Sequence, residues 1–160
     1  MYKINFDKPS HVHFIGIGGI SMSGLAAILL KEGFVVSGSD SHESELTDRL
    51  QAAGARIAYQ QAAENITDGI DVVVYTAAIH PSNPEYAAAV AKKIPLLTRA
   101  QLLGQMMKNY KIPICVSGTH GKTTTTSMAA HILMAADMDP TISVGGILPL
   151  IKGNYRIGSN

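Results

Sequence analysis

A glycine- and threonine-rich segment in the last third of the chain has the residue types of a phosphate-binding loop. It reads Ser117-Gly118-Thr119-His120-Gly121-Lys122-Thr123-Thr124 and lies between an apolar stretch and a stretch with helical character. Glycines let successive backbone N–H groups turn toward phosphate oxygens, and the N-terminus of the following helix adds partial positive charge. Lys122 is placed to reach the β- and γ-phosphates of a nucleoside triphosphate, and the Thr123 hydroxyl to bind Mg²⁺.

The strict P-loop pattern requires a glycine at the position of Val116, so the segment matches only a G-T-x-G-K-T-T variant of that pattern. A threonine-rich helix start with a chance Gly-Lys-Thr is the alternative interpretation. The order of strand, loop and helix around the segment argues against it and favours a site for ATP and Mg²⁺.

A second glycine-rich loop lies near the start of the chain, at Gly16-Ile17-Gly18-Gly19-Ile20-Ser21. It follows the dinucleotide pattern G-x-G-x-x-G with serine in place of the third glycine. Asp40 stands where such folds carry an acid that binds ribose. A loop of this type can hold a diphosphate. A dinucleotide such as NAD is the generic interpretation, and a tight turn without a ligand is the alternative.

Both loops need strands before them and helices after them, and the chain supplies these by alternating short β-branched runs with helical stretches. This pattern predicts a Rossmann-like α/β fold, a parallel sheet with helices on both faces. We expect strands over 12–17, 34–37, 56–59, 71–76 and 95–98, with helices over 21–31, 44–53, 83–93 and 99–110.

A boundary near 108–112 separates a first domain, residues 1–110, from residues 111–160, the start of a P-loop ATPase domain. In the second domain we expect a strand over 112–117, a helix over 122–136 and a strand over 141–144. The remainder, 145–160, shows no clear period.

Composition excludes several function classes. Of the 160 residues 46% are hydrophobic and 16% charged, which is typical of a globular protein. The net charge of +1 gives no global field for nucleic acid or an anionic membrane. The single cysteine, Cys115, excludes an internal disulfide and fits a reducing cytoplasm. No apolar run approaches the length of a membrane span, and the first ten residues do not form a signal peptide.

Taken together, the two loops, about 100 residues apart, resemble those of the Mur ligase family of peptidoglycan synthesis. The resemblance is greatest to the branch that adds L-alanine to UDP-N-acetylmuramate, and it covers the whole chain. The segments that carry it are 13–24, 38–40, 76–79, 83–85, 99–103 and 118–126.

The resemblance implies that the first domain binds UDP-N-acetylmuramate rather than NAD. Diphosphate contacts would come from Gly18, Gly19, Ile20, Met22 and Ser23. Ribose and uracil contacts would come from Ser39, Asp40, Thr76, Ala78, Ile79 and His80. The second domain would bind ATP through Gly118, Thr119, His120, Gly121, Lys122, Thr123 and Thr124, with Lys122 and Thr123 as catalytic residues and Thr123 as a ligand of Mg²⁺.

The family's reaction is an ATP-dependent ligation. The muramate carboxylate takes the γ-phosphoryl group to form an acyl phosphate, and the amino group of L-alanine displaces phosphate. Two departures stand out. Gln60-Gln61 replaces a Gly-His pair, and the chain stops at Asn160 before the acidic metal-binding segment of the family. We therefore expect these 160 residues to bind the UDP-sugar without ligating it.

Three other functions stay open at this point. A related family member attaches a preformed tripeptide to the same UDP-sugar. An NAD-dependent oxidoreductase or sensor would use the first loop but has no need of the second. A regulatory module that binds nucleotides without chemistry would use both.

Smaller features are expected to be structural. His11 and His13 flank the first strand without a third metal ligand, and Cys115 is expected to be a buried apolar residue in its strand. Strands over 112–116 and 142–144 cannot bury both faces alone, so we expect the second domain to pack on the first or to exchange with a second copy as a homodimer.

Overall fold

A parallel sheet organises the first of the two compact units, Met1–Asn109 and Tyr110–Asn160, of the computed structural model, which describes residues 2–159. Its strands are β1 (His11–Ile15), β2 (Val35–Ser39), β3 (Arg56–Ala58), β4 (Val72–Tyr75) and β5 (Leu96–Thr98). They lie in the order β3-β2-β1-β4-β5, and all neighbours are parallel. This is the Rossmann-like arrangement that the sequence predicts.

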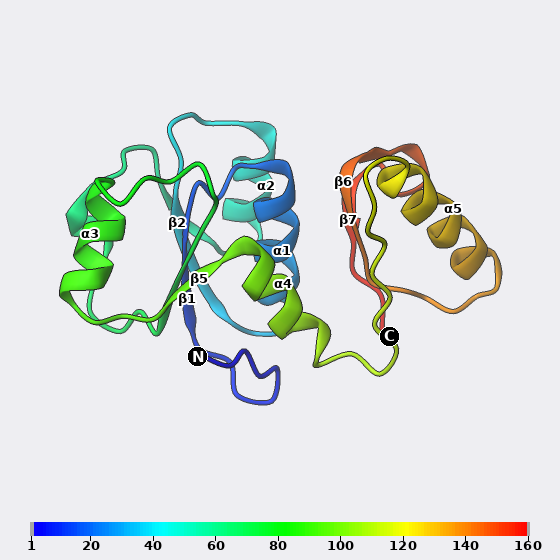
Figure 1. The fold of residues 1–160 in the computed structure, drawn as a ribbon, viewed down its shortest axis with the longest axis horizontal. Coiled ribbons are helices and arrows are strands. Elements are labelled where there is room, and N and C mark those ends of the chain that lie inside the picture. The colour runs from blue at the N-terminus through cyan, green and yellow to red at the C-terminus, as the bar shows by residue number, and fades with distance from the viewer. Residues whose placement is uncertain (1, 160) are drawn as a thin grey trace. The chain divides into compact units, whose positions relative to one another are not determined.

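Helices cover both faces of this sheet, as Figure 1 shows. The helices α1 (Ile20–Lys31), α2 (Glu45–Ala52) and α4 (Arg99–Met107) lie on one face. On the other face, α3 (Pro84–Ala91) packs with the short 3₁₀ turn η1 (Ala63–Asn65). Among the described residues no helix is long and apolar enough to cross a membrane.

Three of these helices begin where a polar side chain caps the first turn. Ser44 and Thr98 each form a capping box, at the starts of α2 and α4. Asn83 accepts hydrogen bonds from two first-turn amides of α3, and Pro84 occupies the first helical position. Such residues satisfy amides that have no partner inside the helix, so these helix starts are set locally.

The core lies on both sides of the central strands. Phe14 of β1 and Val72, Val73 and Val74 of β4 have no exposed surface. Strands buried on both faces read as continuous apolar runs, which is why the sequence shows three valines in a row. On the α3 face, Val73 belongs to an apolar cluster that includes Ala89 of α3.

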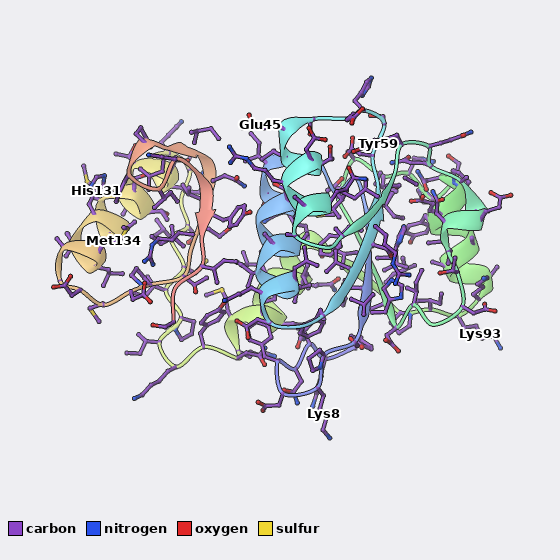
Figure 2. All side chains as sticks on the ribbon, turned by 180° about the vertical axis from the view of Figure 1, so that it is seen from behind. Lys8, Glu45, Tyr59, Lys93, His131 and Met134 are labelled. Atoms are coloured by element: carbon purple, nitrogen blue, oxygen red, sulfur yellow. The ribbon has the colours of Figure 1, made fainter. Side chains whose placement is uncertain are left out.

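Polar side chains connect the peripheral segments of the first unit by hydrogen bonds. The amide side chain of Asn109 accepts a hydrogen bond from the Phe6 main chain (3.0 Å) and donates one to the Ile4 carbonyl (3.1 Å), which joins the last turn of the unit to its first residues. The hydroxyl of Tyr59, after β3, lies 3.0 Å from Gln51 Oε1 on α2 (Figure 2). The labelled Lys8, Glu45 and Lys93 are exposed.

Residues 110–159 of the second unit form one α-helix and two strands. These are α5 (Lys122–Ala135), β6 (Ile142–Leu148) and β7 (Gly153–Arg156), with the 3₁₀ turn η2 (Pro149–Ile151) between the strands. The two strands pair with each other, antiparallel, and with no other strand of the described chain. Their buried apolar cluster consists of Ala130, Ile142, Val144 and Leu148.

A polar cluster joins the residues that flank these two strands. The Asp139 carboxylate accepts hydrogen bonds from the Ser159 hydroxyl (2.6 Å) and amide (2.8 Å), and it pairs with Arg156. These interactions, chiefly the hydrogen bonds from the Ser159 and Arg156 side chains, lower the pKa of Asp139 to about 2. The cluster therefore fixes the end of the described chain to the segment before β6.

Three expectations for the second unit are wrong. Residues 112–117 form no strand, Ile112 and Ile114 are 70% and 63% exposed, and Cys115 is exposed rather than buried. A strand needs a partner for its main chain, and the described strands of this unit pair only with each other. The segment 145–160, expected to be irregular, holds the rest of β6 and all of β7. Gly145 and Gly146 lie inside β6, and Gly153 is the first residue of β7.

Candidate functional site

The first glycine loop is tied to the end of β2 by main-chain amides. Gly16, directly after β1, has a φ of +83°, a conformation that favours glycine. The amides of Gly16 and Ile17 donate to the Ser39 carbonyl, at 2.8 and 2.9 Å. The amide of Gly18 donates to Asp40 Oδ2 at 2.7 Å. Three successive amides therefore fix the path of the loop.

Among the glycines of this loop, Gly18 leaves the least room for a side chain. A Cβ atom at this position would lie 2.9 Å from Asp40 Oδ2 and 3.0 Å from the Thr47 methyl group. The next residue, Gly19, is the N-cap of α1. Because α1 has no side-chain cap and no acid in its first turn, its N-terminus keeps its partial positive charge beside the loop. Such a helix start is suited to an anion.

The five residues expected around a diphosphate divide into two groups. Gly18, Gly19 and Ile20 lie at or near the surface, and Ile20 is 45% exposed. The side chains of Met22 and Ser23 are buried in the packed face of α1, and the Ser23 hydroxyl donates to the Ile20 carbonyl at 2.9 Å. The side chains of Met22 and Ser23 therefore stabilise α1 and its packing.

Asp40 and Ser39, expected near ribose, are both engaged inside the protein. The second oxygen of Asp40, Oδ1, accepts the Ser41 amide at 2.8 Å. Ser39 has no exposed surface, and its hydroxyl donates to Glu85 Oε2 at 2.6 Å. The Ser39 side chain thus faces α3, while Asp40 faces the glycine loop. Their contact with ribose stays a prediction.

The loop after β4 stands at the same edge of the sheet as the glycine loop. The strands β1 and β4 are neighbours, and the strand order reverses between them, which in such sheets opens a crevice for ligands. In this loop Ala78 and His80 are exposed and Thr76 is half-buried. Ile79 packs against the apolar cluster on the α3 face. The structure thus brings both sets of expected UDP-site residues to one edge.

Arg99 is a candidate site residue that the sequence reasoning missed. It directly follows β5, and its guanidinium donates to the hydroxyl of Ser21 in the first turn of α1, at 3.1 Å. A cation therefore lies beside the helix start where an anion would bind. The sequence did contain a signal for this residue. Arg99 directly follows a short strand of the expected parallel sheet, and the carboxyl ends of parallel strands lie at the same edge of a sheet.

The second glycine loop is exposed and holds itself in place. Every residue from 117 to 125 is exposed, which includes His120, Thr123 and Thr124. Gly118 and Gly121 have φ values of +155° and +77°. The Lys122 ammonium donates to the carbonyls of Gly118 (2.7 Å) and Thr119 (3.1 Å). The lysine therefore folds over its own loop.

The start of α5 is open to an anion in the same way as the start of α1. Gly121 is its N-cap, no side chain caps it, and its first turn has no acid. The first-turn positions Lys122, Thr123 and Thr124 thus combine helix-end amides, an ammonium group and hydroxyls, which together suit polyphosphate.

The described residues hold no group of three or more His, Cys, Asp or Glu side chains that could bind a metal ion. Mg²⁺ keeps several waters and commonly binds through substrate phosphates with few protein ligands. The exposed Thr123 hydroxyl fits that mode as one protein ligand.

Comparison with known proteins shows which family the chain belongs to. Residues 11–111, more than half of the chain, match the model described as Mur ligase family, catalytic domain. The chain belongs to the Mur ligase family. The UDP-N-acetylmuramate–L-alanine ligases of Agathobacter rectalis and Clostridium perfringens are 68% and 57% identical to it over 160 and 154 residues, all and 96% of this chain. The chain spans 35% and 34% of their lengths.

Solved structures of the family agree with the fold. The UDP-N-acetylmuramate-alanine ligase of Thermotoga maritima matches with a TM-score of 0.85 at 37% identity, over 94% of this chain and 35% of that one. The UDP-N-acetylmuramate:L-alanyl-γ-D-glutamyl-meso-diaminopimelate ligase of Neisseria meningitides matches with a TM-score of 0.83 at 31% identity, over 94% and 47% of the two chains. Both branches of the family therefore share this architecture.

Proposed function

We propose that this chain is the amino-terminal part of an ATP-dependent ligase that joins L-alanine to UDP-N-acetylmuramate. The observation that carries the proposal is the pair of glycine loops, each opening an uncapped helix, in a chain of this family. The names of two curated relatives, 68% and 65% identical, support L-alanine as the amino acid. The one cysteine is consistent with a cytoplasmic protein.

The first unit is proposed to bind the UDP portion of the sugar nucleotide. The diphosphate lies at the start of α1, where the helix end and the Arg99 guanidinium supply positive charge. The base and ribose lie toward the loop after β4. The proposed contacts are Gly18, Gly19, Ile20, Met22, Ser23, Ser39, Asp40, Thr76, Ala78, Ile79, His80 and Arg99, with Met22, Ser23 and Ser39 acting through main chain or packing.

The second unit is proposed to bind ATP through 118–124. Lys122 moves from its loop carbonyls to the β- and γ-phosphates, and Thr123 binds Mg²⁺, which neutralises phosphate charge. The muramate carboxylate then attacks the γ-phosphorus, and ADP leaves with the bridging oxygen. The alanine amine attacks the resulting acyl phosphate, and phosphate leaves. Positioning and charge neutralisation account for most of such a barrier reduction.

The tripeptide-adding branch of the family is the second candidate. Its solved members match this fold closely, at 31% and 27% identity, against 37% for the solved L-alanine ligase of Thermotoga maritima. The curated L-alanine ligases of Agathobacter rectalis and Clostridium perfringens are 68% and 57% identical. An NAD-dependent enzyme is disfavoured because the second loop would then have no role.

We propose that these 160 residues bind nucleotides without completing the ligation, since they span about a third of the curated relatives. A second copy is the proposed cover for the exposed apolar side chains of the second unit, among them Ile114, Ile132 and Ile147, each more than 60% exposed. Sedimentation equilibrium should give a dimer. A monomer at all concentrations would contradict that part of the proposal.

Calorimetric titration tests the function directly. The chain is titrated with UDP-N-acetylmuramate, with ATP–Mg²⁺ and with NADH. We expect saturable binding of the first two, and loss of UDP-sugar binding in Gly18→Val, whose side chain meets Asp40 and Thr47. Gly104→Ala is the matched control, because a Cβ there has no neighbour within 4 Å. Binding of NADH without the UDP-sugar would overturn the proposal.

A further inference from the structure

A group of polar side chains lies on the sheet face beneath α3, next to the apolar cluster that packs there. His13 of β1, Ser39 of β2 and Glu85 of α3 are 1%, 0% and 0% exposed. A buried carboxylate in a mainly apolar layer is costly unless its charge is hydrogen-bonded. Glu85 therefore needs an explanation that packing alone does not give.

Both oxygens of Glu85 are held. Oε2 accepts the Ser39 hydroxyl at 2.6 Å, and Oε1 accepts the Asn65 amide of η1 at 2.5 Å. The His13 imidazole Nε2 lies 3.6 Å from Oε2. Burial alone would raise the pKa of Glu85, but the interactions with His13, Ser39 and Asn65 outweigh burial and lower it. The carboxylate is thus stabilised in its charged form, in which it accepts strong hydrogen bonds.

Ser39 connects this carboxylate to the glycine loop. Its side chain donates to Glu85, while its main-chain carbonyl accepts the amides of Gly16 and Ile17. The following residue, Asp40, accepts the Gly18 amide. The bonds from these three loop amides are therefore accepted by the last residue of β2 and the residue after it, and Glu85 of α3 holds the first of these two, Ser39.

We propose that Glu85 is a positioning residue for the UDP-sugar site, acting through Ser39 to hold the glycine loop in its binding geometry. The inference rests on the proposed function of the first unit. Glu85 makes no contact with the ligand. Its role is to fix the end of β2, and so the direction in which the loop amides and the start of α1 point.

The test compares variants at Glu85 and Ser39, the two ends of the link, with a control variant at Asn65, which contacts Glu85 from η1. Glu85→Gln removes the charge, and Ser39→Ala removes the bridging hydroxyl. Asn65→Ala is the matched control, because Asn65 holds the same carboxylate from η1 and has no bond to β2. Affinity for UDP-N-acetylmuramate is measured by calorimetry on the 160-residue chain. The amide ¹H–¹⁵N shifts of Gly16, Ile17 and Gly18 are recorded without ligand.

Glu85→Gln and Ser39→Ala are each expected to weaken UDP-sugar binding roughly three- to tenfold, an ordinary size for coupling through packed groups. The double variant should bind the UDP-sugar no more weakly than the single variant with the lower affinity, because both changes break the same link. The loop amide shifts should move in both variants. Asn65→Ala should lower the melting temperature while its affinity stays within about twofold of the original, since its effect does not pass through β2.

Unchanged affinity in Glu85→Gln, with the original chain binding, overturns the inference and leaves the proposed function standing. Additive losses in the double variant overturn it too, because Ser39 would then act independently of Glu85. An original chain that binds no UDP-sugar overturns both. If Glu85→Gln does not fold, the loop amide shifts of Ser39→Ala decide: movement supports the link, and unchanged shifts overturn it.

Discussion

The two glycine loops are alike in how they open a helix, but the two helices differ in how much of them is buried. Each opens a helix without a side-chain cap or an acid in the first turn. Yet α1 buries eight of its twelve residues, whereas α5 buries one of fourteen, Ala130. The sheet of five strands offers α1 a broad apolar face, and the two strands of the second unit do not offer α5 the same. Loop geometry is therefore local, while helix burial depends on the whole sheet.

The loops also differ in what holds them. The first is fixed by a neighbouring strand, through Ser39 and Asp40. The second is held by its own lysine, which bonds to the carbonyls of Gly118 and Thr119. The first loop is thus preorganised by tertiary structure, and the second must release Lys122 to bind phosphate.

Core truncation should show the largest difference between the units. Phe14→Ala, at a fully buried position of β1, should cost the first unit roughly 3–5 kcal/mol. Val144→Ala in the small cluster of the second unit should cost about 1 kcal/mol. Urea unfolding, followed by amide signals assigned to each unit, measures both. Equal losses in the free energy of unfolding would show that the apolar cluster of the second unit contributes as much stability as the core of the first.

Removing the loop lysine should affect only one ligand. Lys122→Ala should weaken ATP–Mg²⁺ binding by roughly ten- to a hundredfold, since a bond to a charged group contributes about 1.5–3 kcal/mol. UDP-sugar affinity should not change, because the first loop is fixed by β2. Lys111→Ala, another exposed lysine, is the matched control. ATP binding by Lys122→Ala that equals the original would remove the second loop from the site.

Acid should destabilise the first unit through Glu85. Its pKa is below the ordinary value, since its hydrogen bonds outweigh burial, so its ionised form stabilises the fold. That stability is fully present above the unfolded pKa of about 4.3 and is lost as pH falls through the lower folded pKa. The gap in unfolding free energy between the original chain and Glu85→Gln should therefore narrow below about pH 4. A gap that is constant from pH 7 to pH 3 would contradict this.

Two glycines in open space should respond in opposite directions. Gly104 lies inside α4, so Gly104→Ala should stabilise the first unit by roughly 0.5–1 kcal/mol through helix propensity. Gly54 also has no neighbour near a Cβ, but its φ of +106° strains any other residue, so Gly54→Ala should lower stability. Thermal unfolding measures both. Stabilisation by both changes would show that the loop at Gly54 adjusts its backbone.

The sequence by itself determined the features that depend on local spacing. Strand and helix order in the first unit and both glycine loops could be predicted because neighbouring residues produce them. The caps at Ser44, Asn83 and Thr98 are equally local, although they are not among the predicted features. Family membership followed from the same segments.

Only the tertiary structure decided where side chains meet. It turned Ser39 toward Glu85, brought Arg99 to Ser21, and left 112–117 without a strand partner. The first two are contacts between residues far apart in the chain, and the third depends on whether a neighbouring strand is available for pairing. Sequence spacing carries no information on either, because a strand's register and partner are set by the sheet as a whole.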